Sequence, residues 1–412
     1  MTGPDMCRRR GEHLRAALLL ALVGIVAGCT GAMAPSASPT FTIAPAATPV
    51  GSLGVGPTTS PAASVPQPPL GPLPTSAIDA AKAAALQRVL ERALVLGAPD
   101  VIAAVITEDG TWAGAAGIGG PDGRAATADD QFAIASITKT FTAVLVLRLA
   151  EQGRIELDAP LATYRGDLLV DTNGATVREA LQMKAGLPDD GPDVADQIVA
   201  DPGRAWTNEE IAAGFQPPFA PAGKAYRYSS PTYQLLAFAV EEVTGMSYAA
   251  ALRAELLDPW QASRIADQIA GMSTPQPWAL PIGEQTGRFD AADLGAGGAL
   301  SCLGSATRTK GAGSIASDAP SLAAWMWHLF AGDILAPASL QTMVPSAGVF
   351  AYGLERAPYG DGSIGSSGNK TGYGAQVTMF PESRAIVVVF VNDPRFAVES
   401  TTMALLGAAA AR

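Results

Sequence analysis

Histidine is scarce in this chain of 412 residues, which contains only two. His13 lies close to the N-terminus, and His328 lies in an apolar stretch where we expect it to pack on a helix. A Ser-His-Asp triad has almost no histidine available as its base, and a zinc site has almost none available as a ligand. If a serine nucleophile operates here, lysine or tyrosine must move its proton.

Cysteine is almost as rare, with three in the chain. Cys7 falls in a segment that we expect to be removed, and Cys29 falls at a position typical of lipid attachment. Cys302 is then alone, so the mature chain has no intramolecular disulfide and Cys302 is expected to be a buried thiol. We also expect no metal and no cofactor.

Basic clusters are missing beyond the first residues, and the net charge is −11. Nucleic acid is therefore not an expected partner. With 48% hydrophobic residues, the chain is long enough to form two lobes around a sizeable core. We expect a monomer.

Long apolar runs are also lacking near the N-terminus. Residues 1–28 contain arginines followed by the twelve apolar residues Ala16–Ala27, too few to span a bilayer comfortably. The run ends in Val-Ala-Gly-Cys29, which resembles a bacterial lipoprotein signal. That resemblance implies an acylated Cys29 on the extracytoplasmic face of the cell membrane. An ordinary signal peptide and an uncleaved anchor remain the alternatives.

Residues 29–75 follow as a segment rich in proline, serine, threonine and alanine, with eleven prolines after residue 29 and no charge. This composition predicts a disordered tether. The folded domain is expected over residues 76–412, with a helical lobe at about 154–335.

The most informative stretch runs from Ser136 to Gly153. Its almost continuous apolar run predicts a buried helix that ends at the glycine. Ser136 and Lys139, three residues apart, should lie on one face of its first turn. A lysine amine can take the proton of a serine hydroxyl, so the pair is typical of nucleophilic catalysis. The same S-x-x-K spacing recurs at Ser367 and Lys370, in a glycine-rich stretch without a helical pattern.

Strand patterns occur at both ends of the domain and helical patterns between them. The first hairpin is expected at 101–117, and later strands at 352–354, 376–380 and 385–391, before a final helix at 398–410. This order predicts an α+β fold (an α/β sandwich), in which an antiparallel sheet from N- and C-terminal segments is flanked by helices and carries an inserted helical lobe.

Several segments, in order, resemble the serine β-lactamase and D-alanyl-D-alanine carboxypeptidase superfamily, nearest to its class C β-lactamases, carboxypeptidases and esterases. The resemblance covers roughly residues 77–410 and implies a β-lactamase/transpeptidase-like fold. The segments that carry it are Phe132–Ala143, Gly153–Asp158, Ala185–Pro188, Pro221–Tyr233, Gly372–Gly374 and Pro381-Glu382.

The family's second motif has tyrosine, one residue, then usually asparagine. Here it reads Tyr228-Ser229-Ser230. The resemblance implies that Tyr228 shares proton transfer with Lys139, whose positive charge would help a phenol act as a base. Ser230 has one hydroxyl where an amide has two donors and an acceptor, so recognition of a substrate amide should be altered.

The third motif is Lys-Thr-Gly or His-x-Gly in the family, on a strand that lines the cleft. A literal Lys370-Thr-Gly372 is present, but the spacing to the following glycine–aromatic pair favours Ser366-Ser367-Gly368. The glycines around Asn369 also place Lys370 at the tip of a hairpin, as a solvated turn residue. Ser366 would then supply a hydroxyl where relatives have a cation.

The sequence therefore predicts a lipid-anchored serine hydrolase that forms an acyl-enzyme on Ser136, with Lys139 and Tyr228 moving the proton. The backbone N–H groups of Ser136 and Asn369 are expected to form the oxyanion hole. A D-alanyl-D-alanine carboxypeptidase or a β-lactamase is favoured, acting on a small molecule or a peptidoglycan peptide. An esterase of the same family and a non-catalytic binding or regulatory domain are the alternatives.

Overall fold

The structure is a computed structural model. It describes residues 69–411, except 120–122, 169, 192, 202–203, 268–302, 347–348, 357–361, 371 and 394. The predicted leader, the predicted lipidation site Cys29, most of the predicted tether and Cys302 lie outside the described residues.

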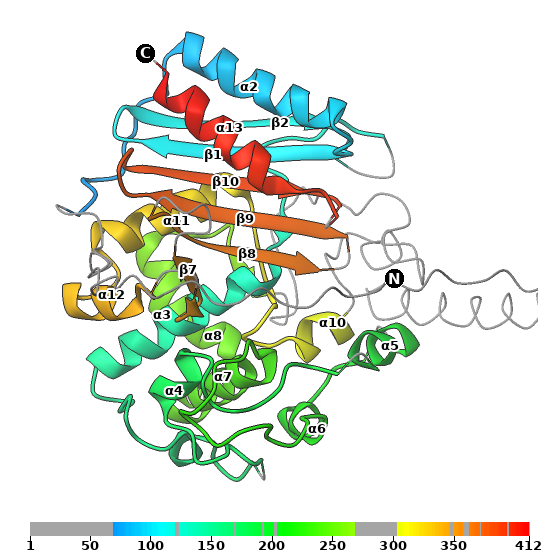
Figure 1. The fold of residues 1–412 in the computed structure, drawn as a ribbon, viewed down its shortest axis with the longest axis vertical. Helices are drawn as coiled ribbons and strands as arrows, with labels where there is room; N and C mark the ends of the chain where they lie inside the picture. Colours follow the sequence, from blue (N-terminus) through cyan, green and yellow to red (C-terminus); the bar gives the residue numbers. More distant parts are fainter. Residues whose placement is uncertain are drawn as a thin grey trace, which may run out of the picture.

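A seven-stranded antiparallel sheet in the order β2-β1-β10-β9-β8-β7-β6 is the centre of the fold. β1 pairs with β2 on one side and with β10 on the other, with Ile102 opposite Phe390. Strands from the two ends of the chain therefore lie side by side (Figure 1), which confirms the predicted fold class. The strands are β1 (Asp100–Thr107), β2 (Gly110–Gly117), β6 (Phe350–Ala351), β7 (Leu354–Arg356), β8 (Ile364–Lys370), β9 (Tyr373–Phe380) and β10 (Ala385–Val391).

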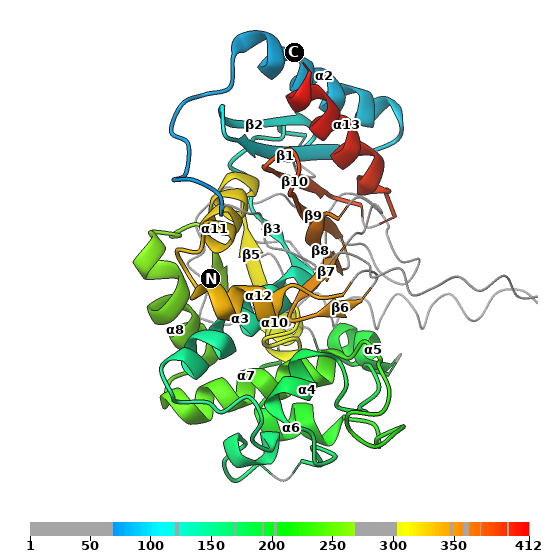
Figure 2. The same ribbon diagram turned by 60° about the vertical axis from the view of Figure 1, so that its left-hand side comes forward.

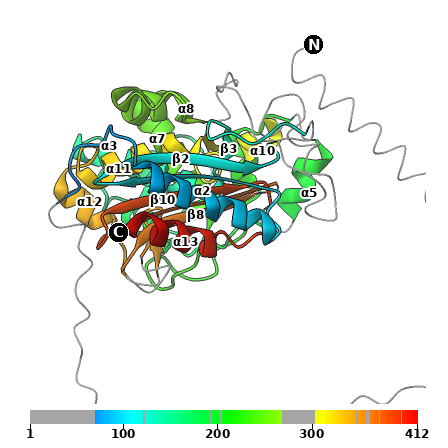
Figure 3. The ribbon, with the colours of Figure 1, turned by 90° about the horizontal axis from the view of Figure 1, so that it is seen from above.

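Each face of the sheet buries a different core. Along β1, Val101, Ala103 and Val105 belong to one apolar cluster, while Ile102 and Ile106 belong to the other. This follows from the alternation of side chains along a strand. Helices α2 (Ala80–Val95) and α13 (Val398–Ala410) cover the first face, and α11 (Ala319–Ala331) covers the second (Figure 3).

The helical lobe lies below the sheet in Figures 1 and 2. A small sheet in the order β3-β5-β4 lies between the two parts (Figure 2). Its strands are β3 (Phe132–Ala133), β5 (Ile315–Ser317) and β4 (Ala266–Asp267). The remaining helices are α3 (Thr138–Glu151), α4 (Val177–Leu181), α5 (Asp193–Ala200), α6 (Asn208–Ala213), α7 (Ser230–Thr244), α8 (Tyr248–Leu252), α10 (Leu303–Arg308) and α12 (Pro337–Met343).

Helix α3 is buried almost all round, as its sequence predicts. Eleven of its fourteen residues are buried, and these include Lys139. No single helix among the described residues is long and apolar enough to cross a membrane, although α7 and the segment Tyr248–Trp260 pass that test together as a bent pair. Helix α3 is thus a core element that carries a polar group inward.

The folded domain begins earlier than the predicted boundary at residue 76. Leu70 is only 3% exposed. The indole N–H of Trp327 donates to the carbonyl oxygen of Gly71 at 2.9 Å, and Arg384 donates to that of Pro69 at 3.0 Å. Residues 69–71 are therefore packed against the folded domain by the buried Leu70 and by these two hydrogen bonds.

Candidate active site

Ser136 lies in a 3₁₀ turn, η1 (Ala135–Ile137), directly before α3. The sequence placed Ser136 in the first turn of the helix, whereas the α-helix begins at Thr138. Ala135 has φ of 45°, a left-handed conformation that is unfavourable for a residue with a Cβ. Ala135 and Ile137 are buried, while Ser136 is half-buried. The strained turn thus leaves Ser136 half-buried between two buried neighbours.

Lys139 points back at this serine from the first turn of α3. Its side chain is fully buried, and Nζ donates to Oγ of Ser136 at 3.1 Å. Nζ also donates to the carbonyl oxygen of Ala312 at 2.8 Å and lies 4.9 Å from the centroid of the Tyr228 ring. These contacts hold the amine in one place beside the nucleophile.

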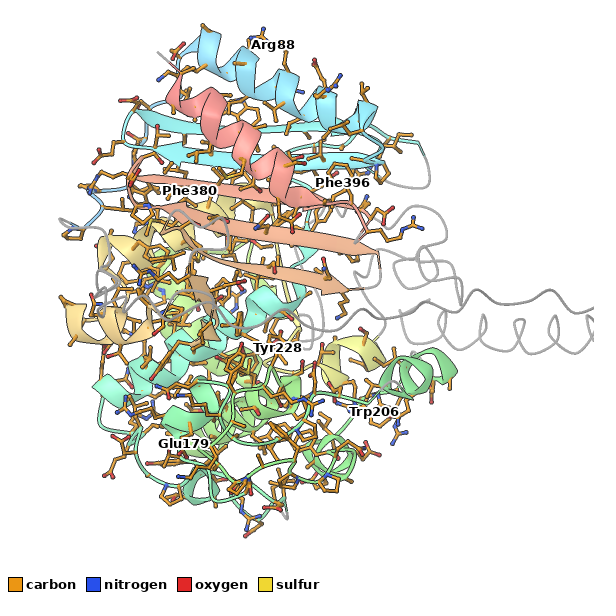
Figure 4. All side chains as sticks on the ribbon, in the orientation of Figure 1. Arg88, Glu179, Trp206, Tyr228, Phe380 and Phe396 are labelled. Carbon is orange, nitrogen blue, oxygen red and sulfur yellow. The ribbon has the colours of Figure 1, made fainter. Side chains whose placement is uncertain are left out.

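Tyr228 approaches Ser136 from the segment that precedes α7, and Figure 4 shows it between the sheet and the lobe. Its hydroxyl donates to Oγ of Ser136 at 2.7 Å, and its ring packs edge-on against Phe350 with centroids 5.2 Å apart. The hydroxyl of the next residue, Ser229, caps α7 by accepting from the N–H of Thr232. The helix start therefore fixes the tyrosine beside the serine.

The region around Ser230 contains acidic residues that the sequence did not single out. The N–H of Ser230 donates to Oδ1 of Asp189 at 2.8 Å, and Asp189 is exposed. Asp190 accepts from Nη2 of Arg308 at 3.0 Å. Burial raises the pKa of Asp190, and the neighbouring Arg308 opposes that rise. The only sequence signal was their position directly after the loop Ala185–Pro188.

Strand β8 approaches the nucleophile through its backbone. A Cβ on Gly368 would lie 2.2 Å from the carbonyl oxygen of Ile134 and 2.9 Å from the nitrogen of Ser136, so only glycine fits. Ser366, two residues earlier and hence on the same face, is 4% exposed, and its Oγ has no hydrogen-bond partner among the described residues. Ser367 and Asn369 are exposed on the alternate positions.

Lys370 differs from the prediction of a solvated turn residue. It is the last residue of β8, paired with Tyr373, and it is half-buried. Its Nζ donates to the carbonyl oxygen of Gly313 at 3.3 Å. Burial lowers the pKa of Lys370 to about 8, against the opposing charge of Asp267. The ladder with β9 continues one residue further than the glycines indicated, and this turns the side chain inward.

The structure therefore brings Ser136, Lys139 and Tyr228 together, with Gly368 against the turn that carries the serine. Ser136 Oγ has two neighbouring groups that can carry its proton, which is the arrangement of an activated nucleophile. Within the described ranges, no group of His, Cys, Asp and Glu side chains is arranged to hold a metal ion.

A family model described as Beta-lactamase matches residues 90–412. Among curated proteins, the chain is 28% identical over 122 residues to Protein flp of Staphylococcus aureus, covering 29% of this chain and 24% of that protein. It is also 28% identical over 138 residues to Penicillin-binding protein 4* of Bacillus subtilis, covering 31% and 28%. The matches thus span about a quarter of the length of these curated relatives.

Solved structures similar to this one include a D-stereospecific amidohydrolase from Streptomyces sp., with a TM-score of 0.66, 23% identity and coverage of 80% of this chain and 98% of that one. A D-amino acid amidase from Ochrobactrum anthropi SV3 gives a TM-score of 0.66 and 23% identity, with coverage of 79% and 98%. An octameric penicillin-binding protein homologue from Pyrococcus abyssi gives 0.65 and 22%, with coverage of 78% and 76%. At these identities the likeness concerns the fold.

Proposed function

We propose that this chain, which belongs to the Beta-lactamase family, is a serine hydrolase that cleaves an amide bond through an acyl-enzyme on Ser136. The observation that carries the proposal is the pair of contacts at Oγ of Ser136, 2.7 Å from the Tyr228 hydroxyl and 3.1 Å from Nζ of Lys139. Each partner is buried or packed in place, so the geometry exists before a substrate arrives.

In the proposed reaction, Oγ of Ser136 forms a bond to the substrate carbonyl carbon while its proton passes to the Tyr228–Lys139 pair. The carbonyl oxygen becomes an oxyanion, for which the N–H groups of Ser136 and Asn369 are the proposed donors. The carbon–nitrogen bond then breaks, and the proton is delivered to the leaving amine. Water hydrolyses the ester with the same two side chains acting in reverse.

For the substrate we propose an amide of a D-amino acid that has no carboxylate beside the scissile bond. Ser366 supplies no cation at the position where relatives carry one, and its hydroxyl is buried. The nearest acidic loop instead presents the exposed Asp189 beside Ser230. A carboxylate at that position favours a neutral or ammonium-bearing group over an anionic one beside Ser230. Two similar structures are described as acting on D-configured amides.

A D-alanyl-D-alanine carboxypeptidase or β-lactamase is the second candidate. It is supported by the similarity to Penicillin-binding protein 4* and to the pyrococcal penicillin-binding protein homologue. Such substrates carry a carboxylate, for which the positions near Ser366, Ser367 and Lys370 would have to provide a contact. A family esterase would need no such contact. A non-catalytic binding domain would show no acylation at all.

Intact-protein mass spectrometry tests these alternatives. The protein is exposed separately to a penicillin and to an activated neutral ester, and turnover is measured with the amides of D- and L-phenylalanine. The proposal expects rapid acylation by the ester, slow acylation by the penicillin, and hydrolysis of the D-amide over the L-amide. Rapid, stable penicillin labelling without amidase activity would favour the second candidate, and inertness toward every probe would favour the binding domain.

We also propose that the enzyme is held on the extracytoplasmic face of the membrane by acylation of Cys29. The support is the Val-Ala-Gly-Cys29 junction after a short apolar run. Cys29→Ser should release the protein from the detergent phase when cells are fractionated, while Cys302→Ser should not. If the Cys29 variant partitions with membranes as the parent does, the anchor is wrong.

A further inference from the structure

Side chains donate hydrogen bonds to the three consecutive backbone carbonyl groups of loop 311–313. The hydroxyl of Thr142 donates to the oxygen of Gly311 at 2.6 Å, and Nζ of Lys139 donates to that of Ala312 at 2.8 Å. Nζ of Lys370 donates to the oxygen of Gly313 at 3.3 Å. Lysines therefore donate two of these three hydrogen bonds, and one of them, Lys139, also contacts the nucleophile Ser136.

The loop is fastened on its far side as well. The hydroxyl of Ser314 donates to Oδ2 of Asp267 at 2.6 Å, and the N–H of Ile315 donates to Oγ1 of Thr138 at 3.0 Å. Thr138 is the first residue of α3, directly before Lys139. Hence a displacement of loop 311–313 would also displace the start of α3 and the amine of Lys139.

Lys370 reaches this loop from β8, whose residues Ser366, Gly368 and Lys370 form what we call the strand wall of the site. The turn at Ser136, helix α3 and Tyr228 form the helical wall. Lys370 lies at the end of β8, one residue after the proposed oxyanion donor Asn369 and two after Gly368, which packs against Ser136. Lys139 reaches the loop from α3. Loop 311–313 is thus the one described segment that both lysines bind, and it links the strand wall to the helical wall.

We propose that Lys370 is a positioning residue that fixes the Ala312 carbonyl, and with it Lys139, by holding the adjacent carbonyl of Gly313. The inference rests on the proposed acyl-enzyme function. The hydrogen bond of Lys370 goes to the loop and not to Ser136, so in this proposal Lys370 acts through the loop. The link fixes the two walls relative to each other before the substrate binds. The groups that transfer the proton and the groups that bind the oxyanion then keep their relative positions.

The environment of Lys370 fits this role. Its charge faces a carbonyl dipole and lies close enough to Asp267 on β4 for that carboxylate to stabilise it. Because burial lowers the pKa of Lys370 to about 8, the ammonium loses its proton in mildly alkaline solution. A neutral amine donates a weaker hydrogen bond than an ammonium. The hydrogen bond from Lys370 to the carbonyl of Gly313 should therefore weaken above that pH.

The test compares Lys370→Met, which keeps length and removes the donor, with Lys370→Arg, which keeps a charged donor. Acylation is measured with a neutral ester and with a carboxylate-bearing penicillin. We expect Lys370→Met to lower the maximal acylation rate about tenfold for both substrates, as the loss of one charge-assisted hydrogen bond predicts, with little change in KM. Lys370→Arg should restore most of the rate. Lys82→Met, on the distant helix α2, is the matched control.

A loss confined to the penicillin, or carried by KM, would mean that Lys370 binds the substrate carboxylate and would overturn the proposal, as would an unchanged rate. If Lys370→Met does not fold, Lys370→Arg still decides. The wild-type rate should fall as pH rises through about 8, and the arginine variant should postpone that fall because arginine keeps its charge; identical profiles would refute the role.

A readout that needs no turnover separates this inference from the proposed function. Hydrogen exchange at the amide of Ile315, which donates to Thr138, should accelerate in Lys370→Met and not in Lys82→Met. If the wild type proves inert toward every probe, the proposed function fails. Hydrogen exchange alone then tests whether Lys370 holds loop 311–313 in place. Unchanged protection at Ile315 would overturn it.

Discussion

The two walls of the site differ in how completely their polar groups are bonded. On the helical wall, the side chains of Ser136, Lys139 and Tyr228 all bond one another or the backbone. On the strand wall, the backbone fit at Gly368 is tight, yet the Ser366 hydroxyl has no partner within the described ranges. Groups that would activate a nucleophile are thus retained on one wall, while groups that would select a substrate are changed on the other.

The largest expected effect is the removal of the nucleophile from the helical wall. Ser136→Ala should abolish covalent labelling and hydrolysis of every substrate. One lost oxygen at a helix start should change the free energy of unfolding by about 1 kcal/mol or less. Mass spectrometry and thermal unfolding check both statements, and undiminished labelling of this variant would remove Ser136 from the mechanism.

Tyr228→Phe tests the same wall more finely. The ring can keep its contacts with Phe350 and with the charge of Lys139, but Oγ of Ser136 loses its 2.7 Å partner. We expect a loss of about a thousandfold in acylation rate, within the range of general acid–base contributions. Tyr226→Phe, at an exposed position two residues earlier, is the control. An equal loss in both variants would show that packing, not the hydroxyl, is responsible.

Gly368→Ala tests the strand wall at its close contact with the backbone of Ile134 and Ser136. The added Cβ meets backbone atoms that cannot rotate away, at 2.2 Å from the Ile134 oxygen, so β8 or the turn carrying Ser136 must move. A displacement of that size near the reacting groups should cost about a hundredfold in rate. Gly407→Ala on α13, where nothing lies within 4 Å, should leave the rate unchanged. Normal kinetics in Gly368→Ala would break the assignment of this wall.

The smallest effect is a gain. Ser366→Lys would place a cation at the motif position where the family carries one, and a charge-assisted contact is worth roughly 1.5–3 kcal/mol. Acylation by a carboxylate-bearing penicillin should therefore rise about tenfold or more, while a neutral ester gains little. Ser367→Lys, at the exposed neighbouring position, serves as the control. If the ester gains equally, the missing cation is not what distinguishes this wall.

The helical wall was largely predictable from the sequence, because its determinants are local. Ser136 and Lys139 are three residues apart, and an apolar run predicted the buried helix that carries the lysine. The hairpin at 101–117 and the final helix at 398–410 were also predicted correctly, since their turn residues and apolar spacing are strong signals.

The strand wall was less predictable, because its structure depends on distant partners. The segment Ile364–Lys370 is rich in serine and glycine, which favour turns over strands, yet pairing with β9 makes it a strand. The inward direction of Lys370 depends on Gly313, and the burial of Asp190 depends on Arg308. Neither contact leaves a mark on the local sequence. The left-handed Ala135 is likewise set by tertiary packing.

The pairing of β1 with β10 joins strands that lie far apart in the sequence, which has a consequence for folding. β1 can meet β2 as soon as the hairpin is made, but Ile102 finds its other neighbour only when Phe390 exists. Contacts so far apart in sequence form slowly, because the closure of the intervening chain must precede them. Until then, an apolar strand edge is open to aggregation. A chain cut short before β8 would keep Ser136 and Lys139 in its sequence, but it would lack the strand against which the turn at Ser136 is packed.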